Sequence, residues 1–249
     1  MKYDEKISQY YDLIFSGKKY REEVDFIKSL CYSKDRNYVL DVGCGTGNHS
    51  LILAEDNRTV KILGIDESKS MIDVAQKKVL NEKIKFQCSS LADIEETNFD
   101  TIISMFNVIN HIHDIPTLYS FFSEVRLRLT STGSFLFDCW NGAATFGDPP
   151  KCETRHRLSE KDISIQTTCN PVSDLMNSQI MMNNTVSIYN NDTLVEKFDY
   201  SLKHAIWTPG FIKSVLKDCG FKTIKIFKHF EKKYATIDDY KIVFVCTPQ

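Results

Sequence analysis

The chain has 249 residues, of which 42% are hydrophobic and 26% are charged, as is usual for a globular protein with a sizeable core. Its 31 basic and 33 acidic residues give a formal net charge of −2, and the lysines are mixed with acidic residues almost everywhere. Because a nucleic-acid binder carries a basic stripe, we expect no nucleic-acid partner.

Helix-like and strand-like segments alternate over the first 140 residues. A helical segment is expected at residues 7–30, followed by a short buried strand at 38–42 that Gly43 ends. Later segments continue the alternation, with strands at 60–65, 84–88, 101–105 and 134–138 and helices at 48–56, 70–80 and 116–129. Alternation of this kind predicts an α/β fold whose parallel sheet is covered by helices on both faces.

The pattern changes between residues 149 and 207. Three strand-like runs separated by turn residues predict a small antiparallel sheet, with strands at 163–169, 179–189 and 194–204. A helix at 209–218, closed by Gly220, and strands at 223–228 and 242–246 then return to the core. We therefore expect a catalytic core of residues 1–148 and 208–249, with an inserted subdomain at 149–207.

A glycine-rich turn follows the first strand, with the pattern Asp-x-Gly-x-Gly-x-Gly over residues 41–47. Glycines let the backbone approach a ligand closely, and the N-terminus of the next helix offers free N–H groups to an anion. The spacing is one residue tighter than the Gly-x-Gly-x-x-Gly of nicotinamide enzymes. It favours S-adenosylmethionine, whose bound anion is a carboxylate, over a dinucleotide.

Asp66 ends the second strand, about 20 residues beyond the last glycine, where a carboxylate accepts both ribose hydroxyls. The alternative is that Asp66 only caps a helix. Glu67 beside it would repel a 2′-phosphate, which argues against NADP. Met71, one helical turn further on, either presses against the adenine or packs in the core.

These features together resemble the class I S-adenosylmethionine-dependent methyltransferases, and the resemblance covers most of the chain. It implies a Rossmann-like fold with a mostly parallel seven-stranded sheet, in which the glycine turn wraps the methionine and ribose parts. The loop after the third strand would read the adenine through the N–H of Leu91. Relatives often carry Asp where this chain has Ser90, so the adenine contact falls to Ser90 or to Asp93.

The loop after the fourth strand is expected to face the transferred methyl group, because open α/β sheets bind ligands beyond the carboxyl ends of their strands. Methyltransferases that act on nucleobase amines usually carry Asp/Asn-Pro-Pro-Tyr/Phe at this point, and residues 104–111 hold no such motif. The Asp-Pro-Pro sequence at 148–150 lies after the fifth strand and reads as a turn.

Segments at 11–20, 105–106, 110–111 and 207–211 are similar to the nucleotide-linked amino-sugar N-methyltransferases. This resemblance implies that the N-terminal helix covers the cofactor, with Tyr20 near its carboxylate. It also implies that the inserted sheet shapes the substrate pocket and a dimer contact, so a homodimer is expected. Residues 137–142 depart from those enzymes, which leaves amine, hydroxyl and phosphate-type acceptors open.

Methyl transfer is an in-line displacement, so the site must hold the acceptor atom on axis. A hydroxyl acceptor usually needs a general base, and His111 is the best-placed candidate, although a purely structural histidine is an equal alternative. The expected acceptor residues are Tyr11, Phe106, Asn107, Asn110, Trp140 and Asn141. The expected cofactor residues are Tyr20, Asp41, Gly43, Cys44, Gly45, Gly47, Asp66, Glu67, Met71, Ser90, Leu91 and Met105.

The eight cysteines are scattered, without a Cys-x-x-Cys pair or a nearby histidine at metal spacing, so we expect reduced thiols and no metal site. The N-terminal residues 1–6 are charged and lead into no apolar run, and no stretch is apolar enough to span a bilayer. A cytoplasmic enzyme that methylates a small molecule is the expectation. A nicotinamide-dependent oxidoreductase is a second hypothesis, but the chain lacks a Tyr-x-x-x-Lys catalytic pair where a short-chain dehydrogenase would carry one. A third hypothesis, a catalytically silent partner protein that binds S-adenosylmethionine, stays open.

Overall fold

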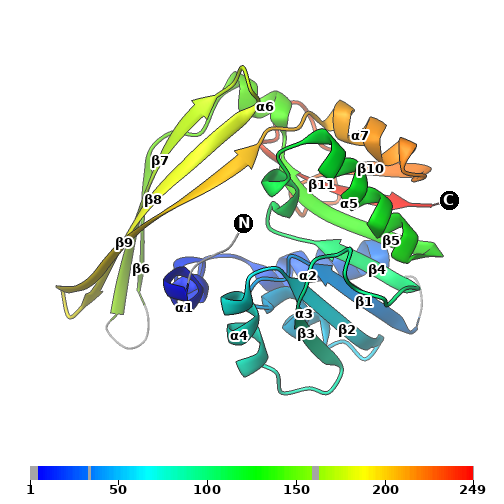
Figure 1. Cartoon of the computed structure of the whole chain (residues 1–249), viewed down its shortest axis with the longest axis horizontal. Coiled ribbons are helices and arrows are strands. Elements are labelled where there is room, and N and C mark those ends of the chain that lie inside the picture. Colours follow the sequence, from blue (N-terminus) through cyan, green and yellow to red (C-terminus); the bar gives the residue numbers. More distant parts are fainter. Residues whose placement is uncertain (1–4, 33–34, 159–162, 249) are drawn as a thin grey trace.

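A computed structural model of the chain describes residues 5–32, 35–158 and 163–248. Figure 1 shows a large sheet layered with helices and a second sheet that extends away from it, with α1 (Glu5–Ile14) between the two. Residues 1–4, 33–34 and 249 of the expected core and residues 159–162 of the expected insertion lie outside the described residues.

The large sheet has seven strands in the order β10-β11-β5-β4-β1-β2-β3. They are β1 (Asn37–Val42), β2 (Thr59–Asp66), β3 (Ile84–Cys88), β4 (Phe99–Ser104), β5 (Leu129–Trp140), β10 (Thr223–Lys228) and β11 (Lys241–Thr247). Strands β1 to β5 are parallel to one another, whereas β11 is antiparallel to both β5 and β10. The sheet is therefore mixed, and the expected Rossmann-like arrangement is confirmed.

Helices cover both faces of this sheet. Buried side chains of α2 (Tyr20–Cys31), α3 (Asn48–Leu53) and α4 (Lys69–Lys77) pack on one face, and those of α5 (Ile115–Arg128) and α7 (Pro209–Asp218) pack on the other. Side-chain caps start several of them: Ser68 accepts from the N–H of Met71, and Asp114 from the N–H of Thr117. In the described residues, no helix combines the length and apolar character that crossing a bilayer requires.

The order of strands places a crevice next to β1. The chain runs from β1 outward to β2 and β3, then returns to β4 on the other side of β1. Loops that follow β1 and β4 therefore diverge at the carboxyl edge of the sheet, which is where ligands bind in folds of this kind.

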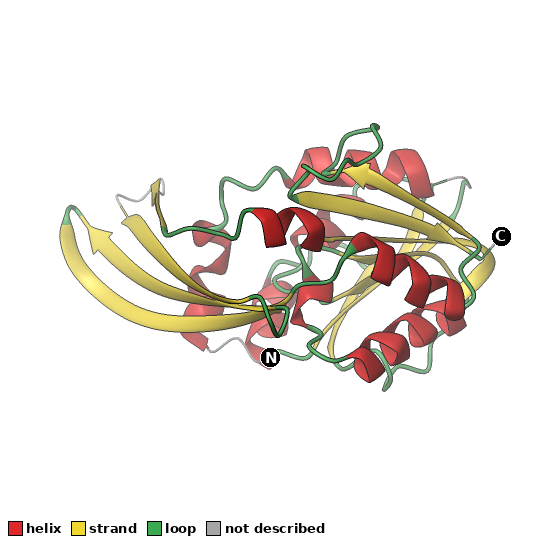
Figure 2. Cartoon of the chain, turned by 90° about the horizontal axis from the view of Figure 1, so that it is seen from above, coloured by secondary structure: helices red, strands yellow, loops and turns green. Residues whose placement is uncertain are grey.

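The second sheet is antiparallel, in the order β6-β7-β8-β9, and Figure 2 shows its strong curvature. Its strands are β6 (Glu153–Leu158), β7 (Ile163–Asp174), β8 (Gln179–Asn190) and β9 (Thr193–Ala205). The hairpin between β8 and β9 turns at Asn191 and Asp192, both at positive φ, as two-residue hairpins require. Helix α1 packs on this sheet, since Ile7 and Ile14 share a cluster with residues of β7 and β8.

The structure differs from the sequence expectations at several elements. The helix expected at 7–30 is two helices, α1 and α2, separated by residues 15–19, and the helix expected at 48–56 ends at Leu53. Strand β6 and two short helices, η1 (Val108–His111) and α6 (Gly142–Gly147), were not predicted. Strand β6 reads Glu-Thr-Arg-His-Arg-Leu and is largely exposed, so it has no apolar period and forms only because β7 supplies its backbone partners.

Candidate functional site

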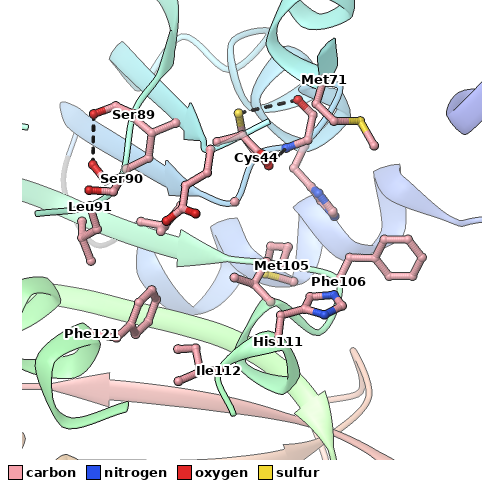
Figure 3. Close-up of a pocket in the computed structure, with 18 of the residues that line it drawn as sticks. Cys44, Met71, Ser89, Ser90, Leu91, Met105, Phe106, His111, Ile112 and Phe121 are labelled. Carbon is pink, nitrogen blue, oxygen red and sulfur yellow. Dashed lines mark hydrogen bonds between the residues drawn. The ribbon is translucent and has the colours of Figure 1, made fainter. Parts of the chain in front are cut away.

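A cavity of about 380 Å³ lies at the carboxyl ends of β1, β2 and β4. Figure 3 shows Ser89, Ser90 and Leu91 on one side of it, Phe106 on another, and His111, Ile112 and Phe121 below. The structure brings together most of the expected residues, with Tyr11, Tyr20, Gly43, Cys44, Gly45, Asp66, Glu67, Met71, Ser90, Leu91, Met105, Phe106 and His111 all lining the cavity.

The glycine turn forms one wall of the cavity, and its glycines are needed for different physical reasons. At Gly45, with φ of 54°, an added Cβ would meet no atom within 4 Å, because that side of the backbone faces open space. At Gly47, with φ of 81°, an added Cβ would lie 2.3 Å from the ring of Phe86. Gly45 therefore leaves room for a ligand, whereas Gly47 is required by packing against β3 and does not line the cavity.

Asp41, the other expected cofactor residue outside the cavity lining, is buried below the turn. Its carboxylate accepts a hydrogen bond of 2.7 Å from Ser50 Oγ, which ties β1 to α3. Burial raises the pKa of Asp41. In this structure Asp41 supports the turn from beneath.

Asp66 is held in a fixed orientation at the end of β2. Its two carboxylate oxygens accept from the backbone N–H of Gly45 at 3.0 Å and of Ser68 at 2.8 Å. Ser68, and not Asp66, is the N-cap residue of α4. Burial raises the pKa of Asp66. The remaining acceptor capacity of this carboxylate suits a pair of ribose hydroxyls.

The wall opposite Phe106 suits an adenine ring. Ser90 Oγ donates to the carboxylate of Asp93 at 2.6 Å, and Asp93 itself is not among the lining residues. Ile112, in the loop before α5, and Phe121, in the middle of α5, add an apolar surface (Figure 3). Sequence reasoning missed these two residues, because single apolar side chains at such positions also fit ordinary core packing.

Asp12 anchors α1 beside the cavity through hydrogen bonds. The sequence analysis did not predict this role. Its carboxylate accepts from Thr46 Oγ1 at 2.6 Å, Asn48 Nδ2 at 2.9 Å and Lys78 Nζ at 2.8 Å. Burial works to raise the pKa of Asp12, but the bonds from Lys78 and Thr46 bring it below its usual value. One side chain thus joins α1 to the glycine turn, to α3 and to α4.

The loop after β4 is shaped by Asp138. Phe106 and Asn107 have φ of 70° and 62°, and the backbone N–H groups of both donate to the buried carboxylate of Asp138 on β5. Burial would raise the pKa of Asp138, but the nearby His229 and Lys18 lower it, so the group is ionised. A carboxylate inside the apolar run 135–140 was the available sequence signal for this role.

His111 lines the cavity in a buried position. Its Nδ1 lies 3.4 Å from the carbonyl oxygen of Lys203, and its ring centroid is 4.7 Å from that of His204. Burial lowers the pKa of His111 to about 4. The imidazole is therefore neutral at physiological pH.

Four expected acceptor residues lie outside the lining of the cavity: Asn107, Asn110, Trp140 and Asn141. Asn110 is fully buried, donates to the carbonyl of Ala205 at 2.8 Å and accepts from the N–H of Trp140 at 3.0 Å. Asn141 caps α6 through the N–H of Ala143. Trp140 packs on His204, with ring centroids 4.7 Å apart. These contacts join the two sheets next to the cavity.

Comparison with known proteins points to one class. Residues 39–133 match the family model described as a methyltransferase domain. A Bacillus subtilis protein, YqeM, provisionally assigned as a methyltransferase, is 24% identical over 240 residues, which cover 94% of this chain and 92% of that protein.

Two solved structures share the fold over nearly the whole chain. An S-adenosylmethionine-dependent methyltransferase from Clostridium acetobutylicum matches with a TM-score of 0.78 at 18% identity, covering 96% of each chain. The sugar N-methyltransferase KedS8 from Streptoalloteichus matches with a TM-score of 0.76 at 16% identity, covering 96% of this chain and 92% of that one.

The chain is thus an S-adenosylmethionine-dependent methyltransferase with a Rossmann-like core. The site fits this cofactor, because Gly45 leaves space beside the turn and the carboxylate of Asp66 is already oriented toward the cavity end of β2. The cofactor supplies a methyl group on a positively charged sulfur.

Proposed function

We propose that the enzyme methylates an amine nitrogen of a small molecule, and that the favoured acceptor is a nucleotide-linked amino sugar. The low basicity of His111 carries this proposal. A base whose pKa is about 4 removes a proton from a hydroxyl poorly, whereas a neutral amine attacks with its own lone pair. The site therefore needs to position the acceptor more than to deprotonate it.

Aromatic rings near the end of β4 support a role in positioning. The ring of Phe15 lies 4.7 Å from that of Tyr11 and 5.0 Å from that of Phe106. Such rings exclude water from a sulfonium group and favour a positive charge over their faces. Tyr11 and Phe106 line the cavity, so the acceptor and the methyl group would meet against an apolar surface.

The likeness to the Streptoalloteichus sugar N-methyltransferase spans 92% of that enzyme's chain, which supports an acceptor of the same class. We further propose that residues 149–207 act as a subdomain that encloses the acceptor. Arg155 and Arg157, on β6, support this role because they line a second cavity that also contacts Phe106.

The test is methyl transfer from isotope-labelled S-adenosylmethionine to a panel of nucleotide-linked amino sugars and their hydroxyl counterparts, read by mass spectrometry. We expect label on nitrogen, and His111→Asn should keep turnover within about tenfold of the wild type. Label on oxygen, with a loss of about 100-fold or more in His111→Asn, would replace the proposal with hydroxyl methylation and general-base catalysis. Cofactor binding without turnover of any acceptor would favour a silent partner protein.

A further inference from the structure

A second cavity, of about 430 Å³, lies on the far side of Phe106. It is bounded by the end of α1 and the turn into α2, by β6, and by residues of the segment from β10 to β11. Phe106 lines both cavities, so the two spaces share one wall. The basic residues that line the second one are Lys18, Lys19, Arg155, Arg157, His229 and Lys241.

The acidic side chains of this cavity are already engaged. Glu23 pairs with Lys18 and Glu22 pairs with Lys19. Glu231 lies 3.4 Å from both Lys228 Nζ and Lys233 Nζ, which do not line the cavity. Little negative charge is therefore left for the other basic residues.

Two of those residues, Arg157 and Lys241, form no salt bridge within residues 5–32, 35–158 and 163–248. Both help to lower the pKa of Glu153, but that carboxylate is paired with Arg155. The Nε of Arg157 is buried and lacks a hydrogen-bond partner in the described part of the chain. Its guanidinium lies against Gly17, where an added Cβ would stand 3.0 Å from Arg157 Nη2. The absence of a side chain at Gly17 thus makes room for this guanidinium between α1 and α2.

Lys241 lies among charges of both signs. Burial lowers its pKa, Asp138 and Glu23 act to raise it, and the neighbouring cations Lys18 and Arg155 act to lower it. Cations gathered in a partly closed cavity repel each other unless an anion joins them.

We propose that this second cavity binds a phosphate group of the methyl acceptor, with Arg157 and Lys241 as its direct ligands. The inference rests on the proposed function and specifies its substrate class. The planar guanidinium matches phosphate oxygens in a two-pronged hydrogen bond, and the ammonium of Lys241 adds a point charge. The phosphate occupies one side of Phe106, and the reacting nitrogen reaches past Phe106 toward the methyl group.

The experiment titrates inorganic pyrophosphate into the full-length protein by calorimetry, with and without saturating S-adenosylhomocysteine. Arg157→Gln and Lys241→Gln should each weaken pyrophosphate binding about tenfold or more, because each removes a charged hydrogen-bond donor. Arg157→Lys keeps the positive charge but loses the bidentate hydrogen-bonding geometry of the guanidinium. Its affinity for pyrophosphate should therefore lie between that of these two variants and that of the wild type. Lys225→Gln, an exposed lysine of β10 outside the cavity, is the matched control and should bind like the wild type.

Absent pyrophosphate binding in the wild type would overturn the inference, and so would an equal loss in Lys225→Gln, which would indicate a general charge effect. S-adenosylhomocysteine affinity should stay unchanged in all four variants. If S-adenosylhomocysteine binds and pyrophosphate does not, only this inference fails. If S-adenosylhomocysteine itself does not bind, the proposed function fails as well.

Discussion

At the scale of single residues, backbone donors decide what several side chains can do. Asp66 and Asp138 are carboxylates at strand ends, and each accepts two main-chain N–H groups. Asp66 faces the cavity, whereas Asp138 holds Phe106 in its unusual conformation from behind. The sequence pattern predicted a role for Asp66 because a known motif includes an acidic residue at this position. The role of Asp138 could not be predicted in the same way, because it depends on the strand order that places β4 beside β5.

Asp66→Asn should weaken S-adenosylmethionine binding strongly while leaving the protein folded. The amide keeps one acceptor oxygen for the turn but loses charge-assisted bonds to the ribose, each worth about 1.5–3 kcal/mol. Calorimetric titration measures the affinity, and thermal unfolding checks the fold. Asp73→Asn, an exposed carboxylate of α4 paired with Lys69, is the control. Unchanged affinity in Asp66→Asn would contradict the assignment of the ribose site.

His204 should make the protein less stable in acid. Burial, with smaller effects from His111 and His113, lowers its pKa to about 3 from 6.5, so the folded protein binds its proton only at lower pH than the unfolded chain. Stability is then complete above about pH 6.5 and falls as the pH drops toward 3, since the unfolded state binds more protons.

His204→Phe removes this titration and should flatten the dependence of the unfolding free energy on pH by about 1.4 kcal/mol per pH unit between pH 6 and 4. Urea unfolding at each pH measures it. His156→Phe, on the exposed strand β6, is the comparison and should keep the wild-type slope. Equal slopes in the wild type and His204→Phe would show that the folded state protonates His204 normally.

At the scale of elements, the glycine turn and α1 both contribute to the lining of the first cavity and are joined through Asp12. Gly47→Ala adds left-handed strain and a clash with Phe86, so it should cost about 2–4 kcal/mol of unfolding free energy. Gly45→Ala adds strain alone, about 1 kcal/mol, but its methyl group enters space beside the cavity. Denaturant unfolding and cofactor titration should therefore distinguish the two variants. Gly45→Ala should lose more cofactor affinity relative to its loss of stability than Gly47→Ala does. Identical stabilities would refute this division.

Asp12→Ala should loosen α1. It removes the acceptor shared by Thr46, Asn48 and Lys78, so hydrogen exchange in residues 5–14 should accelerate and S-adenosylmethionine should dissociate several-fold faster. Global stability should change less, because Ile7 and Ile14 still pack on the second sheet. Asp25→Ala, an exposed carboxylate of α2, serves as the matched control. Unaltered exchange and dissociation in Asp12→Ala would mean that packing alone holds the helix.

At the scale of the whole molecule, periodicity predicted the alternating core and the three longer strands of the second sheet, because burial imposes those patterns. It did not predict β6, whose polar residues gain order only from pairing with β7. It also placed Asn110 and Asn141 at the acceptor, although their amides satisfy backbone groups where the two sheets join. The contact of Arg157 with Gly17 links residues 140 positions apart, which no local pattern encodes.

The position of α1 has a further consequence for the order of events in one catalytic cycle. The helix carries Tyr11 into the cofactor cavity and Ile14 into the basic one, and it packs on the second sheet. If the acceptor binds as proposed, displacing α1 to exchange the nucleoside would also dismantle the side on which the acceptor binds. Steady-state kinetics should therefore follow a compulsory sequence, in which the cofactor arrives first, the methylated product departs before the spent nucleoside, and that product inhibits noncompetitively against S-adenosylmethionine.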